Sequence, residues 1–241
     1  MMIIFLVLIT VCLAAFTQGI IGFGFALISM PILSIILGVK TAVPLIALTG
    51  FCINLYLFLK FRNKIHKNEI IFLLLGSLIS VPIGVNVLKY LSENFLMILL
   101  ALIVFFYLIV SALKVDYKIS YNWKKTFIWG FLAGFFGGAL NTNGPVIIIY
   151  SKIRGHQKDE FRALLANFFF FMGIFLVSNH IIFGIINVNI LEYFLILIVP
   201  MMLCLHYGFY FYGKIIKEKF EIIIKVFLGI IGLLLIIKSI Y

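Results

Sequence analysis

Apolar residues run along this chain in eight long stretches that are separated by short polar connections. The stretches cover roughly residues 2–38, 42–59, 70–88, 95–113, 126–150, 163–183, 191–213 and 222–240. A helix needs about 20 residues to cross the hydrocarbon core of a bilayer, so each stretch is long enough for one crossing or for two shorter helices. The pattern therefore predicts an all-α polytopic membrane protein, with connections too short to hold a soluble domain.

The first and fifth stretches share an interruption by glycine that is followed by proline. These landmarks are Gly22, Gly24 and Pro31 in the first stretch and Gly137, Gly138 and Pro145 in the fifth. Broken segments in corresponding halves of a chain are the expected sign of a transporter binding site near the bilayer midplane. We therefore predict two four-segment repeats, residues 1–113 and 126–241, joined by a cytoplasmic loop at 114–125.

Composition and charge support a membrane location and set its orientation. The chain is 65% hydrophobic with a formal net charge of +11, and fifteen basic residues flank the apolar stretches in four groups. These are Lys60, Arg62, Lys64 and Lys67; Lys114, Lys118, Lys124 and Lys125; Lys152, Arg154, Lys158 and Arg162; and Lys214, Lys217 and Lys219. Basic loops beside membrane helices mark the cytoplasmic side and contact anionic lipid headgroups, so the charge gives no support for nucleic-acid binding.

The four basic groups fall on one side only if residues 126–150 enter and leave the membrane by the same face. Eight simple crossings would instead divide the groups evenly between the two faces. The re-entrant solution makes the second repeat an inverted copy of the first, with both termini outside the cell and Lys40 and Lys89 opposite the basic loops. Residues 2–22 are also long enough, at about 31 Å as a helix, to cross outright.

The interruption is most polar at residues 141–145, which read Asn-Thr-Asn-Gly-Pro. Pro145 suits the first position of a new helix, and Asn143 is a suitable N-cap beside it. A helix start carries partial positive charge and free N–H groups, so it binds an anion without a buried Lys or Arg. Ser29 to Pro31 predicts a similar helix start in the first half. For the glycines, close packing of helices is the alternative explanation.

Two mid-span amides, Asn54 and Asn167, occupy similar places in the two repeats, counted from the prolines. We expect both to line the central cavity or, alternatively, to form interhelical hydrogen bonds worth about 0.6 kcal/mol each. Arg162 either steers anions inward or marks the cytoplasmic face. His180 and His206 are imidazoles within the spans, for which ordinary hydrogen bonding is the simpler explanation.

The predicted substrate-binding residues come from both interruptions and from the two amides. They are Gly22, Gly24, Ser29, Pro31, Asn54, Gly137, Gly138, Asn141, Thr142, Asn143, Gly144, Pro145 and Asn167. We predict no catalytic residue, metal site or cofactor, because the spans hold neither paired carboxylates nor a His/Cys cluster.

The order of these motifs resembles the TauE/SafE sulfite exporter family, also called the 4-toluene sulfonate uptake permease family, over nearly the full length. The residues that carry the resemblance are Gly19 to Gly24 with Pro31, Ala47 to Asn54 with the basic loop after it, Gly76, Pro82 and Gly84, then Gly130 to Gly138, Gly144–Pro145, and Phe161 to Ala163 ahead of Asn167. The resemblance implies two four-segment repeats and movement of small anions, often sulfur-containing ones such as sulfite or sulfonates.

The sequence therefore predicts a secondary transporter of small anions in the cell membrane. An anion channel is the closest alternative, because the sequence does not show whether two gates open together. A membrane scaffold or assembly factor is the other alternative, although it gives no reason for two polar interruptions.

Overall fold

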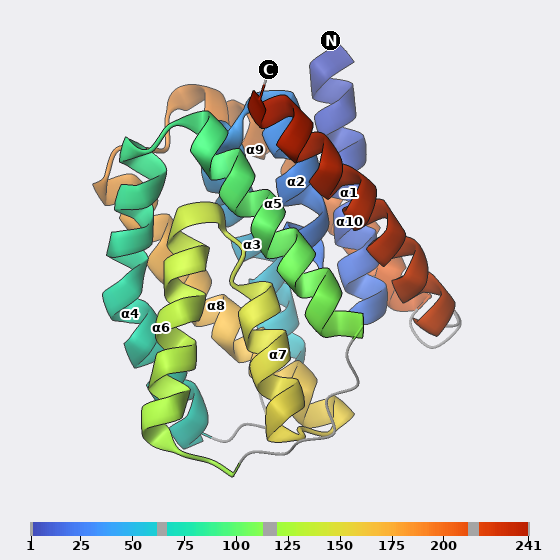
Figure 1. Ribbon diagram of the computed structural model, residues 1–241. Helices are drawn as coiled ribbons and strands as arrows, with labels where there is room; N and C mark the ends of the chain where they lie inside the picture. Colours follow the sequence, from blue (N-terminus) through green and yellow to red (C-terminus); the bar gives the residue numbers. More distant parts are fainter. Residues whose placement is uncertain (1, 62–66, 113–119, 212–216, 241) are drawn as a thin grey trace.

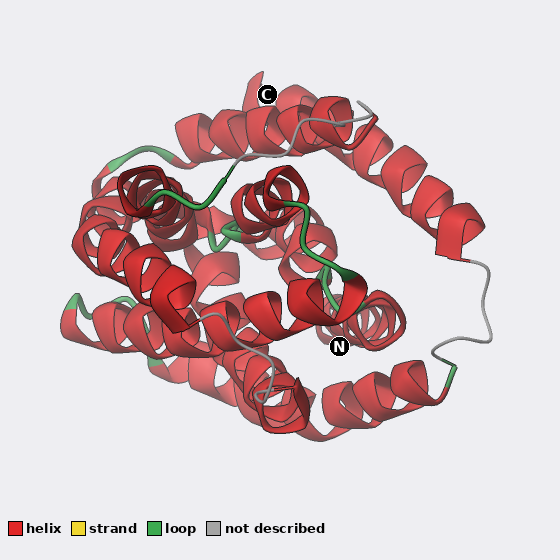
Figure 2. Cartoon of the chain, turned by 90° about the horizontal axis from the view of Figure 1, so that it is seen from below, coloured by secondary structure: helices red, strands yellow, loops and turns green. Residues whose placement is uncertain are grey.

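The computed structural model describes residues 2–61, 67–112, 120–211 and 217–240, and these form ten helices. The helices are α1 (Met2–Ile21), α2 (Phe25–Leu37), α3 (Val39–Phe61), α4 (Lys67–Tyr90), α5 (Glu93–Ala112), α6 (Trp123–Leu140), α7 (Gly144–Arg154), α8 (Lys158–Ile182), α9 (Val188–Tyr210) and α10 (Lys217–Ile240). Figure 2, viewed from below, shows helices and connecting segments and no strand in the described part of the chain.

Ten helices arise from eight apolar stretches because the first and fifth stretches each fold into a hairpin. The hairpins are α1–α2 and α6–α7, while α3, α4, α5, α8, α9 and α10 each correspond to one stretch. Figure 1 shows α1 and α2 joined inside the molecule with their outer ends at the top, and α6 and α7 joined inside with their outer ends at the bottom. Within the described part of the chain, six helices, α1, α3, α4, α5, α8 and α9, are long and apolar enough to cross a membrane. The prediction of a polytopic all-α protein with two interrupted segments is confirmed.

The described basic side chains of the four groups lie at helix ends on one side of the bundle. They are Lys60 near the end of α3, Lys124 and Lys125 at the start of α6, Lys152 and Arg154 at the end of α7, and Arg162 near the start of α8. All four helix ends are at the bottom in Figure 1, whereas both termini of the chain are at the top. The other members of the four groups lie outside the residues whose side chains the structure describes.

Side chains cap several of the helices at their first residues, and α6 and α3 are two examples. The Asn122 side chain accepts hydrogen bonds from the first amides of α6, at 3.0 and 3.2 Å. At the opposite end of the bundle, the Glu93 carboxylate accepts from the amides of Val39 and Lys40, at 2.7 and 3.1 Å. Because these amides have no partner within their own helix, the caps fix where α6 and α3 begin.

The two halves of the chain, α1–α5 and α6–α10, do not form two separate bundles, because helices of one half pair with helices of the other. Helix α1 packs along α9, α6 along α4, α3 along α8, and α5 along α10. Each pairing joins one half to the other, and the first helix of each half contacts the fourth helix of the other half. Gly19 and Gly138, each two residues before the end of the first helix of its half, both lie at such a crossing. This arrangement accords with the predicted repeats, whose boundaries at 113 and 126 remain a prediction.

At the α4–α6 crossing, glycines from both helices bring the backbones close together. A Cβ atom at Gly76 or Gly84 would overlap the carbonyl oxygen of Phe127 or Phe135 on α6. A Cβ atom at Gly130 would likewise overlap backbone atoms of Leu73 on α4. Small residues permit such contacts in membranes, where dispersion forces and packing drive helix association.

We expect Gly130→Ala to destabilise the protein by about 1–3 kcal/mol, the usual cost of forcing an extra methyl group into a packed core. The unfolding temperature of the purified protein in detergent measures this effect. Gly229→Ala on α10 is the matched control, because a Cβ atom there would lie 3.7 Å from Leu108, an ordinary contact. Equal unfolding temperatures for the two variants would contradict this account of the crossing.

Candidate functional site

A cavity of about 50 Å³ lies between the two hairpins, with room for a few water molecules or one small anion. Both interruptions and the middle parts of α3 and α8 contribute to its wall. From the predicted site it includes Gly24, Asn54, Asn141, Thr142, Asn143, Gly144 and Pro145. Among the described residues that line it, none carries a charge.

The first interruption is a tight turn at Gly22 and Gly24, whose φ angles are +93° and +110°. Such backbone conformations are strained for residues with a Cβ atom, which explains the glycines. Helix α2 then begins at Phe25, and its first helical hydrogen bond runs from the Ile28 amide to the Gly24 carbonyl at 3.0 Å. The amides of Ala26 and Leu27 precede that bond, and both residues line the cavity.

Two amide side chains join the first interruption to α3. The Gln18 side chain is 4% exposed, and its Oε1 atom accepts from the Phe25 amide at 2.8 Å. Its Nε2 atom donates to Asn54 Oδ1 at 3.3 Å. Gln18 therefore lines the cavity and caps α2.

The second interruption places the start of α7 on the same cavity. Asn141 ends α6 in the left-handed conformation, with φ at +53°, and Gly144 is the first residue of α7. The side chains of Asn141 and Asn143 are 6% and 8% exposed and make no hydrogen bond to any described residue. Buried amides normally find partners, so these two groups are available to a ligand in the cavity.

The predicted role of Asn143 as a side-chain cap was wrong. Asn143 does occupy the residue before α7, but its backbone is helical, with φ −67° and ψ −21°, and its side chain forms no capping bond. A capping side chain needs an extended backbone to reach back to the helix amides. Pro145 is correspondingly the second residue of α7 rather than the first.

The helix start predicted at Ser29 to Pro31 was also wrong. Pro31 lies inside α2, and the Ser29 hydroxyl donates to the Phe25 carbonyl at 2.7 Å, so neither residue lines the cavity. Pro44, Pro82 and Pro200 are likewise inside helices, and only Pro145 lies at a helix start. Membrane helices tolerate internal proline because neighbouring groups satisfy the freed carbonyls.

The corrected helix starts change which residues correspond between the halves. Asn54 lies fifteen residues after the start of α3, and the residue fifteen positions after the start of α8 is Gly173. Both of these residues line the cavity. Asn167 does not line it: its Nδ2 atom donates to the Ala163 carbonyl at 2.7 Å, while its Oδ1 atom is buried without a partner in the described structure.

The remaining glycines of the predicted site serve packing. A Cβ atom at Gly138 would overlap α4, and one at Gly137 would lie 2.7 Å from Met172 and 3.3 Å from Asn143. Gly144 differs, because a Cβ atom there would meet only the Phe169 ring at 4.0 Å. Close packing, which was the alternative explanation for the glycines, therefore accounts for Gly137 and Gly138.

The charged and titratable candidates lie away from the cavity wall. The Arg162 guanidinium lies 5.6 Å from the centre of the Phe61 ring. The same side chain lies near the backbone of Gly22, because a Cβ atom added to Gly22 would be 3.6 Å from Arg162 Nε. His180 is fully buried, with both ring nitrogens lacking a partner in the described structure, and His206 is exposed. The anion-steering role of Arg162 remains a prediction.

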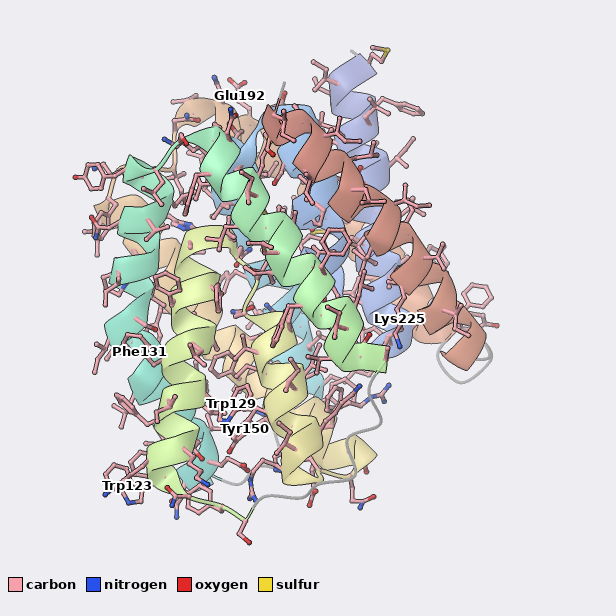
Figure 3. The ribbon with its side chains drawn as sticks, viewed as in Figure 1. Trp123, Trp129, Phe131, Tyr150, Glu192 and Lys225 are labelled. Atoms are coloured by element: carbon pink, nitrogen blue, oxygen red, sulfur yellow. The ribbon has the colours of Figure 1, made fainter. Side chains whose placement is uncertain are left out.

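A buried polar cluster at the lower end of the bundle was not predicted. Glu69, on α4, is 2% exposed and accepts hydrogen bonds from three side chains. These are the Tyr150 hydroxyl, Arg154 Nε at 2.8 Å and His156 Nε2 at 3.1 Å. Figure 3 shows Tyr150 beside Trp129, in the lower half of the molecule. We call Glu69, Tyr150, Arg154 and His156 the Glu69 cluster.

The Glu69 cluster ties α7 to α4, and Thr126 of α6 joins it through a 3.1 Å hydrogen bond to Tyr150. Since α7 has only eleven residues, its first turn faces the cavity while its last turns hold Glu69. The position of the helix start at the cavity thus depends on the cluster. In the sequence, Tyr150 and Arg154 lie four residues apart and so share one helix face, but nothing near them indicates Glu69 as their partner.

Comparison with known proteins agrees with this architecture. No curated protein and no solved structure shows significant similarity to the chain. The model of one protein family, described as Sulfite exporter TauE/SafE, matches residues 7–236. That match includes both interruptions, every cavity residue and the Glu69 cluster, and it makes this multi-pass membrane protein a member of the TauE/SafE sulfite exporter family.

Proposed function

We propose that the protein is a secondary transporter of small sulfur-containing anions, sulfite or a short sulfonate, which it binds in the cavity between the hairpins. The observation that carries this proposal is the convergence of two helix starts, those of α2 and α7, on one uncharged cavity. Free amides at a helix start and the helix dipole, equivalent to about half a positive charge, attract an anion. The unpartnered side chains of Asn141 and Asn143 add hydrogen-bond donors to the same cavity.

The size and neutrality of the cavity favour a particular kind of anion. A volume of about 50 Å³ suits a compact oxyanion better than an aromatic sulfonate. Binding by dipoles rather than by a buried lysine is moderate in strength, and a carrier must release what it binds. The two hairpins enter from opposite ends of the bundle, so each could line one side of an alternating pathway.

Flux of radiolabelled sulfite into proteoliposomes tests the proposal. We expect saturable uptake that is accelerated by unlabelled sulfite on the other side, the signature of a carrier. Non-saturable flux without counterflow would favour an anion channel, and no flux of sulfite, thiosulfate or methanesulfonate would favour a scaffold.

We propose that the basic end of the bundle faces the cytoplasm and that the protein resides in the cell membrane. A reporter fused after Lys64, Lys118, Gln157 or Lys217 should then read as cytoplasmic, because Lys and Arg accumulate on that side. A reporter after Gly184, at the other end, should read as external. A cytoplasmic result for the first pair with an external one for the second pair would contradict the inverted arrangement.

A further inference from the structure

We propose that Gln18 is a positioning residue, which holds the Asn54 amide so that its NH₂ group faces the cavity and donates to the bound anion. This inference rests on the proposed anion-binding function and adds to it a specific donor. It also explains why a buried glutamine is placed at the interruption, where the turn itself needs only glycine.

The orientation of both amides follows from one backbone group. The Phe25 amide can only donate, so the Gln18 atom that it contacts at 2.8 Å must be the oxygen. The Gln18 nitrogen then faces Asn54 at 3.3 Å, and because this nitrogen can only donate, Asn54 must present its oxygen. The remaining atom of Asn54, its Nδ2, is consequently left as a donor.

Among the described residues, the Asn54 side chain forms its hydrogen bond through Oδ1, to Gln18, and Asn54 lines the cavity. A flipped Asn54 would put two donors against each other and turn its oxygen toward the anion. A flipped Gln18 would put its NH₂ group against the Phe25 amide. Because Gln18 is 96% buried, leaving its NH₂ group or the Phe25 amide against another donor would be costly.

The hydrogen-bonded pair of Gln18 and Asn54 has no counterpart at the equivalent positions of the second half. The positions that correspond to Gln18 and Asn54, counted from the end of α6 and the start of α8, are Gly137 and Gly173. Both are filled by neighbouring side chains, since a Cβ atom would lie 2.7 Å from Met172 at the first and 3.1 Å from Phe51 at the second. The first half therefore supplies an oriented side-chain donor on α3, whereas the second half supplies Asn141 and Asn143 from its interruption.

A double-mutant cycle on sulfite binding separates a positioning role from a structural one. The variants are Asn54→Leu, which removes the donor, Gln18→Met, which removes the orienting group at similar size, and the two combined. Asn179→Leu is the control, because Asn179 on α8 bonds its own helix at Phe175 and does not line the cavity. Affinity is measured by calorimetry on purified protein, and folding by size-exclusion profile and unfolding temperature.

We expect each single variant to bind sulfite about tenfold more weakly, the size of effect for losing a hydrogen bond to a charged ligand. In the combined variant the loss should equal that of Asn54→Leu within about twofold, because Gln18 acts through Asn54. The Asn179→Leu control should bind like the wild type.

Three results would overturn the inference. Losses that multiply in the combined variant would show that Gln18 acts separately, through the start of α2. Wild-type affinity in Asn54→Leu would refute the donor even if Gln18→Met failed to fold, while leaving the proposed function standing. A wild-type protein that binds no sulfite would overturn the proposed substrate and this inference together.

Discussion

Replacing Glu69 with alanine is expected to destabilise the protein by about 3–5 kcal/mol, the cost of removing one member of a buried ion pair. The substitution removes the carboxylate that contacts Arg154, the Tyr150 hydroxyl and His156. These groups belong to α7 and the loop after it, so α7 should loosen from α4. Thermal unfolding of purified protein measures the loss.

Two further variants control this experiment. Glu192→Ala should unfold like the wild type, because Glu192 is exposed at the upper end of the bundle, as Figure 3 shows. Adding Arg154→Met to Glu69→Ala should recover part of the loss, since removing both members of a buried pair costs less than removing one. An unchanged unfolding temperature in Glu69→Ala would show that the cluster does not hold α7 in place.

Asn143→Asp should weaken sulfite binding by at least about 100-fold at pH 8 while the protein still folds. Two like charges about 4 Å apart repel by about 4 kcal/mol in a medium of intermediate dielectric constant, and asparagine and aspartate have nearly the same shape. Because the Asn143 side chain takes no part in capping α7, the substitution changes the cavity and not the helix start. Calorimetry with sulfite and the proteoliposome flux both measure the effect.

Asn189→Asp provides the matched control, because it makes the same chemical change at an exposed position near the start of α9. Normal sulfite affinity in a well-folded Asn143→Asp protein would mean that the anion does not bind at the start of α7. Equal losses in both variants would point to net charge rather than to the cavity.

The sequence predicts the membrane fold well because its signals are local. Apolar length marks the spans, and the placement of lysine and arginine distinguishes a hairpin at 126–150 from a single crossing. Gly22 and Gly24 indicate the first turn, since their backbone angles are costly for other residues. Proline is a poorer guide: Pro31 and Pro145 look alike in sequence, yet one lies inside a helix and the other at a helix start.

The site is less predictable because its interactions join distant residues. Gln18 meets Asn54 across 36 positions, and Glu69 meets Tyr150 across 81. Nothing near Gln18 in the chain indicates its partner, and Glu69 reads as an ordinary polar residue at the end of an apolar stretch. Asn167 is an example of a false signal. Counting from the prolines makes it equivalent to Asn54, but counting from the helix starts does not.

The pairing of helices between the two halves affects the order in which the protein can fold during its synthesis. Helix α1 leaves the ribosome well before α9, which begins at Val188, yet the two helices pack together and Gly19 lies against Gly208. Until most of the chain has been synthesised, α1 must remain in the bilayer without this partner, with polar Thr17 and Gln18 near its end. The α4–α6 crossing can form much earlier, so we expect it to organise the nascent protein before α1 joins α9.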